Sequence, residues 1–213
     1  MKSIAKMMAI VFATLVVTPS AEAKPRDFAK QSITAKSAEG AVIFTAGIYS
    51  NRYEMRIARF NPVTKKTAGI SVLPVDTLKS VLTNGGSDAL IIKKLKPGRY
   101  VLQTLIIQSD FAGCLREKTV GFDVVAGKTL YLGRLMTQLS LLSIEAMLRA
   151  TGQAQTIPNF MRIVQTNLWP PLWTLEAALP LQPLLEQAKA LKFSYDTPVE
   201  TQKVFMTDFA YGC

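Results

Sequence analysis

The sequence predicts a mainly β protein, an antiparallel β-sandwich of Ig-like type with a small α/β extension at its C-terminal end. Two observations predict the sandwich. Short apolar runs recur from residue 41 to residue 135, and turn signals separate them at roughly ten-residue spacing. Within residues 51–60, apolar and charged side chains alternate, which is typical of a strand with one buried face.

Residues 1–23 are expected to be a cleavable signal peptide. Lys2 and Lys6 flank the start of an apolar run over residues 7–17, and Ala21 and Ala23 are the small residues that signal peptidase accepts. The alternative is an uncleaved membrane anchor, but a membrane span needs roughly 20 apolar residues, about twice this run. No cysteine stands at the cleavage point, as a lipoprotein anchor would require. We therefore expect a periplasmic or secreted protein with no transmembrane span after cleavage.

Residues 24–40 are polar and basic, and we expect them to form an exposed arm before the sandwich domain of residues 41–135. The sequence Lys96-Pro97-Gly98-Arg99 places proline and glycine where a type II turn needs them. The strands expected on either side of this and the other turns are residues 41–49, 51–60, 68–75, 89–95, 100–108, 120–125 and 129–135.

Residues 136–213 are expected to form an extension that packs on the sandwich and contains one or two helices. Residues 139–151 fit either a helix or a strand, because periodicity does not separate the two. Residues 160–166 and 201–209 resemble strands, and the two prolines at 170 and 171 favour a short helical turn over residues 172–178. An amphipathic helix is indicated by apolar residues at helical spacing, namely Leu181, Leu184, Leu185, Ala188 and Leu191.

Two stretches resemble a known type of protein. They are Leu95-Lys96-Pro97-Gly98-Arg99-Tyr100 and the segment from Phe122 to Gly133, in which Gly127 makes a short hairpin turn. Over residues 41–135 the chain resembles uncharacterised bacterial envelope proteins with a transthyretin-like or carboxypeptidase-regulatory-like β-sandwich, including the DUF2846-like group. The resemblance implies a sandwich fold. It implies no activity and no functional residues, because that group has no agreed activity.

The composition argues against most catalytic chemistry. The chain has no histidine, which removes histidine-based triads, H-E-x-x-H zinc sites and histidine pH switches. No motif for a nucleophilic serine, a phosphate-binding loop, a metal or a cofactor is present. We therefore expect a non-enzymatic protein without a cofactor. The alternative is a hydrolase that uses carboxylates, such as Asp110, Glu117 and Asp123, or a Ser/Lys pair in a cleft between the sandwich and the C-terminal helix.

The two cysteines, Cys114 and Cys213, are expected to form one disulfide in an oxidising compartment. The alternatives are two free thiols or an intermolecular bond through the C-terminus.

Basic residues supply the first candidate binding surface, and the formal net charge of the chain is +10. One group lies near the first hairpin and the other around the Pro-Gly turn, and the two would form one cationic patch if these hairpins are neighbours. A simple solvated surface is the alternative. Nucleic acid is not expected, because no aromatic stacking platform accompanies the charges. The candidates are Arg52, Arg56, Arg59, Lys65 and Lys66, with Lys93, Lys94, Lys96 and Arg99.

Trp169 and Trp173 flank Pro170, Pro171 and Leu172 in the most apolar stretch of the mature chain. Large aromatic side chains suit a binding surface, and they suit packing of the C-terminal helix onto the sandwich equally well. The leading hypothesis is an envelope protein that binds a protein partner or an anionic envelope polymer or surface, or that has a structural role. The sequence leaves the oligomeric state open.

Overall fold

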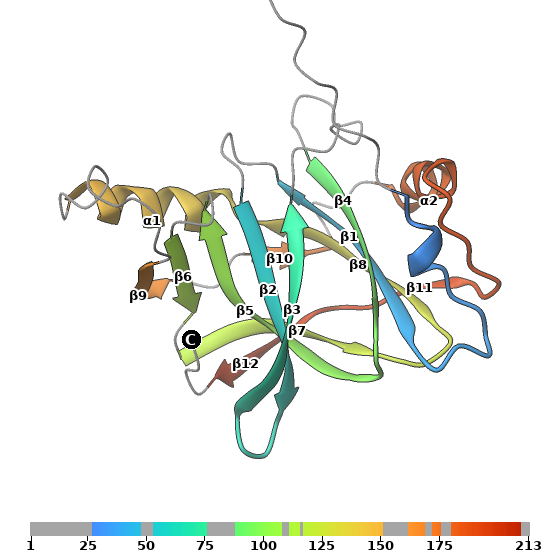
Figure 1. Ribbon diagram of the computed structural model, residues 1–213, viewed down its shortest axis with the longest axis horizontal. Coiled ribbons are helices and arrows are strands. Elements are labelled where there is room, and N and C mark those ends of the chain that lie inside the picture. Colours follow the sequence, from blue (N-terminus) through green and yellow to red (C-terminus); the bar gives the residue numbers. More distant parts are fainter. Residues whose placement is uncertain are drawn as a thin grey trace, which may run out of the picture.

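The computed structural model describes residues 27–47, 53–75, 88–107, 111–115, 117–150, 162–168, 172–175 and 180–209. Within these residues the chain is mainly β, as predicted (Figure 1). The elements are η1 (Ala29–Gln31), β1 (Gly40–Gly47), β2 (Tyr53–Asn61), β3 (Lys66–Val75), β4 (Asp88–Leu95), β5 (Gly98–Ile107), β6 (Phe111–Leu115), β7 (Glu117–Val124), β8 (Thr129–Met136), α1 (Gln138–Ala150), β9 (Arg162–Leu168), β10 (Leu172–Thr174), α2 (Leu181–Ala190), β11 (Val199–Thr201) and β12 (Phe205–Phe209).

The first sheet has the order β10-β8-β1-β4, and β11 pairs with the same edge of β8 as β10 does. Strands β1 and β4 are antiparallel, with Ile43 opposite Ile92. Strand β8 runs parallel to both β1 and β11. Parallel neighbours need a long connection between them, so this sheet joins segments that lie far apart in the sequence.

The second sheet has the order β12-β7-β5-β2-β3, and all these neighbours are antiparallel. Residues 104–107 of β5 pair with β6 instead of β7. Strand β6 also pairs with β9, in parallel. The register between β2 and β5 shifts at Arg56 and Ile57, so β5 contains a bulge at this point.

One hydrophobic core takes residues from both sheets. Alternating residues of β1 and β2, such as Phe44 and Ile57, are fully buried in it. Trp173 lies in the same core, with its ring centroid 4.9 Å from that of Phe44 and 5.5 Å from that of Phe122. This aromatic cluster contains residues from both sheets and therefore ties them together.

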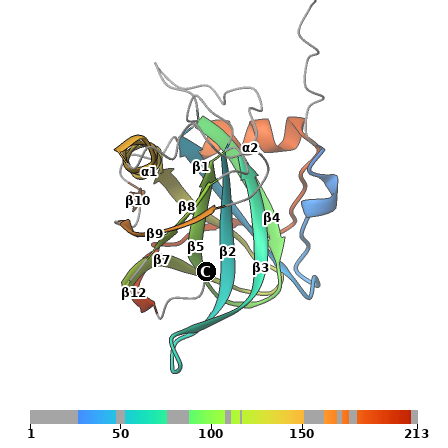
Figure 2. The ribbon, with the colours of Figure 1, turned by 60° about the vertical axis from the view of Figure 1, so that its left-hand side comes forward.

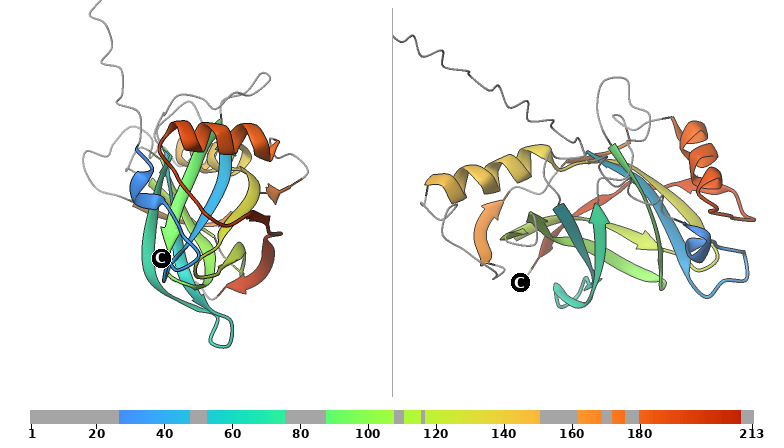
Figure 3. Two further views of the ribbon diagram at one scale, coloured as in Figure 1. Left: turned by 90° about the vertical axis from the view of Figure 1, so that its right-hand side faces the viewer. Right: turned by 45° about the horizontal axis from the view of Figure 1, so that its top comes forward.

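The opposite face of the first sheet is covered by α2 and by the segment that precedes β1 (Figures 1 and 3). Phe28 and Ile33 of that segment are 5% and 1% exposed, and the backbone N–H of Ile33 donates to the Ser194 carbonyl at 3.0 Å. Residues 27–40 therefore do not form a free arm, because Phe28 and Ile33 dock it on the sheet, although many of its other side chains, such as Lys30 and Lys36, are exposed. Two apolar side chains in a polar stretch are enough to dock it, because the sheet and α2 provide a second apolar surface.

The region after residue 136 also differs from the expected appended unit. Strands β10 and β11 complete the first sheet and β12 completes the second. Residues 172–174 form a strand instead of a helical turn, because β10 pairs with β8 and buries Trp173. Helix α1 resolves the ambiguity over residues 139–151 in favour of a helix, and α2 confirms the predicted amphipathic helix.

Neither α1 nor α2 has the length and apolar character needed to cross a membrane, and no other helix in the described ranges does.

Candidate binding surface

The β2–β3 hairpin carries the first group of candidate basic residues, and its turn is closed by a side chain. The Asn61 Oδ1 atom accepts hydrogen bonds from the backbone N–H groups of Val63 at 2.9 Å and Thr64 at 3.1 Å. This arrangement is the turn that asparagine favours, with Pro62 next in the chain. Lys65 ends the turn with a φ of 56°. The hairpin extends beyond the ends of the neighbouring strands (Figures 1 and 2).

The turn between β4 and β5 lies beside this hairpin. The Arg59 Nη2 atom donates a hydrogen bond to the Pro97 carbonyl at 2.9 Å. Gly98 has a φ of 147°, which favours glycine, and a Cβ atom there would lie 2.9 Å from Arg59 Nε and displace this guanidinium. The Tyr100 hydroxyl donates to the Lys96 carbonyl at 2.9 Å and fixes the other side of the turn. The two groups of basic residues are thus neighbours.

Arg99 lies on the first residues of β5 and is engaged by β7 and β12. Its Nε and Nη2 atoms donate to the two carboxylate oxygens of Asp123 at 2.9 and 3.1 Å, and its guanidinium lies 4.6 Å from the Phe205 ring centroid. The hydrogen bond with Asp123 raises the pKa of Arg99. Arg99 therefore joins three strands, and its charge is balanced.

The other positive charges at this end are only partly balanced. Lys65 pairs with Asp208 of β12 at 3.1 Å. In the described part of the chain, Arg59, Lys66 and Lys96 have no carboxylate partner, and Arg59 donates only to a neutral carbonyl. We call Arg59, Lys65, Lys66, Lys96 and Arg99 the basic surface. It carries an excess of three positive charges, because Asp208 and Asp123 each neutralise one of its five.

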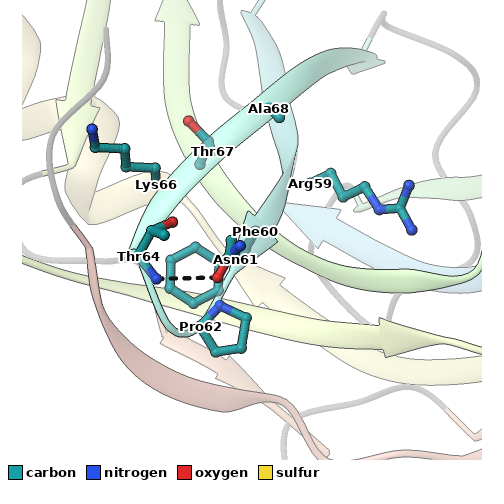
Figure 4. Close-up of a pocket in the computed structure, with 8 residues that line it drawn as sticks. All are labelled: Arg59, Phe60, Asn61, Pro62, Thr64, Lys66, Thr67 and Ala68. Atoms are coloured by element: carbon teal, nitrogen blue, oxygen red, sulfur yellow. Dashed lines mark hydrogen bonds between the residues drawn. The ribbon is translucent and has the colours of Figure 1, made fainter.

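A shallow hollow of about 450 Å³ lies on the hairpin within the basic surface (Figure 4). Its lining contains two cations and no carboxylate: Arg59, Phe60, Asn61, Pro62, Thr64, Lys66, Thr67 and Ala68. The Arg59 and Lys66 side chains point away from each other, toward opposite sides of the hairpin. They do not converge on one point, so the hollow does not form a two-cation clamp for a small anion.

The remaining basic candidates do not gather here in the same way. Arg56 is half-buried on β2, and Arg52 lies outside the described residues. Lys93 and Lys94 point to opposite faces of β4, because successive strand side chains alternate. Lys94 lies 3.8 Å from Glu39, on the side of the N-terminal segment.

Trp173 is 5% exposed and belongs to the core, so it is not part of a binding surface. Of the two interpretations of the tryptophan stretch, packing is the one the structure supports for this residue. Trp169 lies outside the described residues.

The predicted disulfide involves a residue that the structure does not describe. Cys114 lies on β6, where its Cα is opposite Thr104 of β5 and Gln165 of β9. Cys213 lies outside the described residues, so the disulfide stays a prediction.

Of the carboxylates considered for catalysis, the two that lie within the described residues do not converge. Glu117 begins β7 and Asp123 lies near its other end, six residues away, which is about 20 Å along a strand. Asp123 is also engaged by Arg99. Asp110 lies outside the described residues. Within the described ranges, no group of three or more acidic or cysteine side chains could hold a metal ion.

A buried ion pair was missed by the sequence reasoning. Asp88, at the start of β4, is 1% exposed. Its Oδ1 atom accepts from Arg134 Nη2 at 2.9 Å, and its Oδ2 atom lies 2.9 Å from Arg134 Nε. These residues are 46 positions apart and no local pattern links them. The pair lies on the first sheet, and Asp88 is the one buried carboxylate among the residues whose side chains the structure describes.

Comparisons of the chain with protein-family models, with curated proteins and with solved structures found no match.

Proposed function

We propose that this chain is an exported, non-enzymatic protein of the cell envelope that binds an anionic envelope surface through its basic surface. We further propose that its two sheets form a sandwich of the transthyretin-like type that the two resembling stretches suggested. The signal-like residues 1–23 support export. The two neighbouring turns, which hold cations on ordered backbone, support binding.

The observation that carries the proposal is the uncompensated charge of Arg59, Lys66 and Lys96. Exposed cations are usually interspersed with carboxylates, which weaken their field. The described carboxylates at this end, Asp123, Asp208 and Glu39, each lie within ion-pair distance of another basic residue, namely Arg99, Lys65 and Lys94. A negatively charged ligand is therefore attracted to this end by a net positive potential, which no unpaired described carboxylate weakens.

The directions of the side chains favour an extended ligand with several charges. The Arg59 and Lys66 side chains extend in different directions from the hairpin and do not converge, so the arrangement is not built to hold one small anion between them (Figure 4). A polymer or a surface with repeated negative charges can contact both together with Lys96. A protein partner has less support, because Trp173, one of its two predicted aromatic anchors, is buried in the core.

The test compares two triple variants with the same change in net charge. One changes Arg59, Lys66 and Lys96 to Gln. The control changes Lys30, Lys36 and Lys189 to Gln, which are exposed on the N-terminal segment and α2. Binding to long-chain polyphosphate and to vesicles that contain phosphatidylglycerol is measured against salt concentration.

We expect the native protein and the control to bind at least one of these probes, with affinity that falls as salt rises. The triple variant of the basic surface should bind at least tenfold more weakly than the control. Equal binding by the two triple variants, or no binding by the native protein, would contradict the proposal.

A further inference from the structure

The β2–β3 hairpin projects beyond the neighbouring strands (Figures 1 and 2), and its tip carries an exposed apolar side chain. Val63 is 89% exposed, more than the other large apolar side chains of the described residues. Pro62 beside it is also exposed. Single exposed apolar residues are common on protein surfaces and need no explanation by themselves. The surroundings of Val63 distinguish it.

Two backbone donors of this tip are satisfied by a side chain and not by water. The N–H groups of Val63 and Thr64 both bond to the Asn61 side chain, and Pro62 has no N–H. Burying an unsatisfied backbone N–H in an apolar layer costs free energy that these internal bonds avoid. The tip can therefore enter a poorly hydrated environment more easily than an ordinary turn.

Positive charges stand directly behind the tip, and no acidic residue lies within it. The segment from Asn61 to Lys66 contains two lysines and no carboxylate. Lys66 and Arg59 extend to the two sides of the hairpin. An apolar point between laterally spread cations is complementary to a plane of anionic headgroups above a hydrocarbon layer.

We propose that the β2–β3 hairpin docks on an anionic phospholipid surface, with Val63 inserted at the headgroup boundary and Lys66, Arg59 and Lys96 on the lipid phosphates. This inference rests on the proposed function and adds the class of ligand and the inserted residue. The cations supply most of the attraction, and Val63 selects a bilayer over a soluble polyanion.

The experiment uses cosedimentation of the full mature chain with phosphatidylcholine vesicles, with and without phosphatidylglycerol. Two variants change the tip, Val63→Ser and Val63→Asp. The matched control is Val125→Ser, which alters a 45% exposed valine on the β7–β8 turn. Polyphosphate binding is measured on the same proteins.

We expect binding to require phosphatidylglycerol. Val63→Ser should weaken it about threefold to fivefold and Val63→Asp about tenfold or more, with Val125→Ser unchanged. Polyphosphate binding should be unchanged in Val63→Ser, because a soluble polymer has no apolar layer. Circular dichroism of Val63→Ser should match the native protein, as the side chain contacts little.

Two results would overturn the inference alone. These are vesicle binding that is equal in Val63→Ser and the native protein, and polyphosphate binding without vesicle binding; both leave the proposed function standing. Failure to bind either probe would overturn both the inference and the proposed function.

Discussion

Asp88 and Arg134 show how one residue depends on another far along the chain. Asp88 is almost completely buried, whereas the Arg134 side chain is 30% exposed. Losing the partner should therefore destabilise the fold more when it leaves Asp88 unpaired than when it leaves Arg134 unpaired. A buried carboxylate without a partner is costly, but an arginine with access to water can be hydrated.

Replacing Arg134 by Met should therefore destabilise the protein more than replacing Asp88 by Asn. At neutral pH we expect losses in the free energy of unfolding of about 3 kcal/mol and about 1 kcal/mol, respectively. Urea unfolding measures both. Equal losses in the two variants would contradict this account.

Tyr131 gives the fold a sensitivity to high pH. Burial, together with the nearby charge of Asp88, raises the pKa of the Tyr131 hydroxyl from 10.0 to about 12. The folded state therefore holds this proton more tightly than the unfolded chain, so the stabilisation is full below pH 10 and is lost as the pH rises through about 12.

We expect the native protein to lose about 1–2 kcal/mol more than Tyr131→Phe between pH 9 and pH 12, because phenylalanine keeps the ring and has no proton to lose. Denaturant midpoints of both proteins across this range measure the difference. Parallel pH profiles would show that Tyr131 does not contribute.

Gly98 connects backbone conformation to the basic surface. Gly98→Ala should cost about 1–3 kcal/mol, because φ is positive and the new methyl group would meet the Arg59 guanidinium. It should also weaken polyphosphate binding by displacing Arg59. Gly47→Ala is the matched control, since a Cβ there makes only an ordinary contact at 3.8 Å with Asp88. Thermal unfolding and binding of both variants test this, and equal behaviour would contradict it.

At the scale of elements, the sequence predicted strands well where their signals are local. Alternation and turn residues identified most strands between residues 41 and 135, and apolar spacing identified α2. The errors occurred where pairing with a distant strand decides the structure. β10 follows two prolines that resemble a helix start, but pairing with β8 and burial of Trp173 make it a strand. β6 lies between the expected strands 100–108 and 120–125 and was not predicted, because only its pairing with β5 and β9 defines it.

The candidate site was predictable only as a set of residue types. Sequence indicated two basic groups, but the bond from Arg59 to Pro97 that joins them spans 38 residues. The pairing of Lys65 with Asp208 spans 143 residues, so sequence could not show which charges are balanced. Phe28 and Ile33 were overlooked because the surface that buries them is formed by α2 and the first sheet.

The position of β12 makes the predicted disulfide sterically accessible. Phe209 lies opposite Glu117, and Cys114 of β6 precedes Glu117 by three residues, a chain length that spans at most about 11 Å. The four residues from Phe209 to Cys213 can span about 13 Å. The bond would fasten the end of an edge strand that pairs only with β7 in the described part of the chain.

Peptide mapping of the non-reduced protein from the envelope fraction should recover Cys114 linked to Cys213. Loss of the bond in Cys213→Ser should lower the free energy of unfolding by up to about 4–5 kcal/mol, since it closes a loop of about 100 residues. Cys114→Ser should have the same effect, and the double variant should be no worse than either. Recovery of free thiols or of a covalent dimer would contradict the intramolecular bond.

At the scale of the whole molecule, export should remove the first 23 residues. N-terminal sequencing of the protein recovered from the envelope should begin at Lys24, and Ala23→Arg should leave an uncleaved form attached to the inner membrane. The folded body should be unaffected, because the described core begins at Phe28. Recovery of native protein that starts at Met1 would contradict the expectation.

The strand β8 also determines when the chain can finish folding. Its neighbours are β1, near the beginning of the chain, and β10 and β11, near its end. Contacts across such separations form slowly, because the entropy of closing a long loop is lost before the strand contacts can stabilise the fold. The first sheet cannot be completed until residue 201 is available, so we expect β8 to gain its last neighbours only at the end of folding.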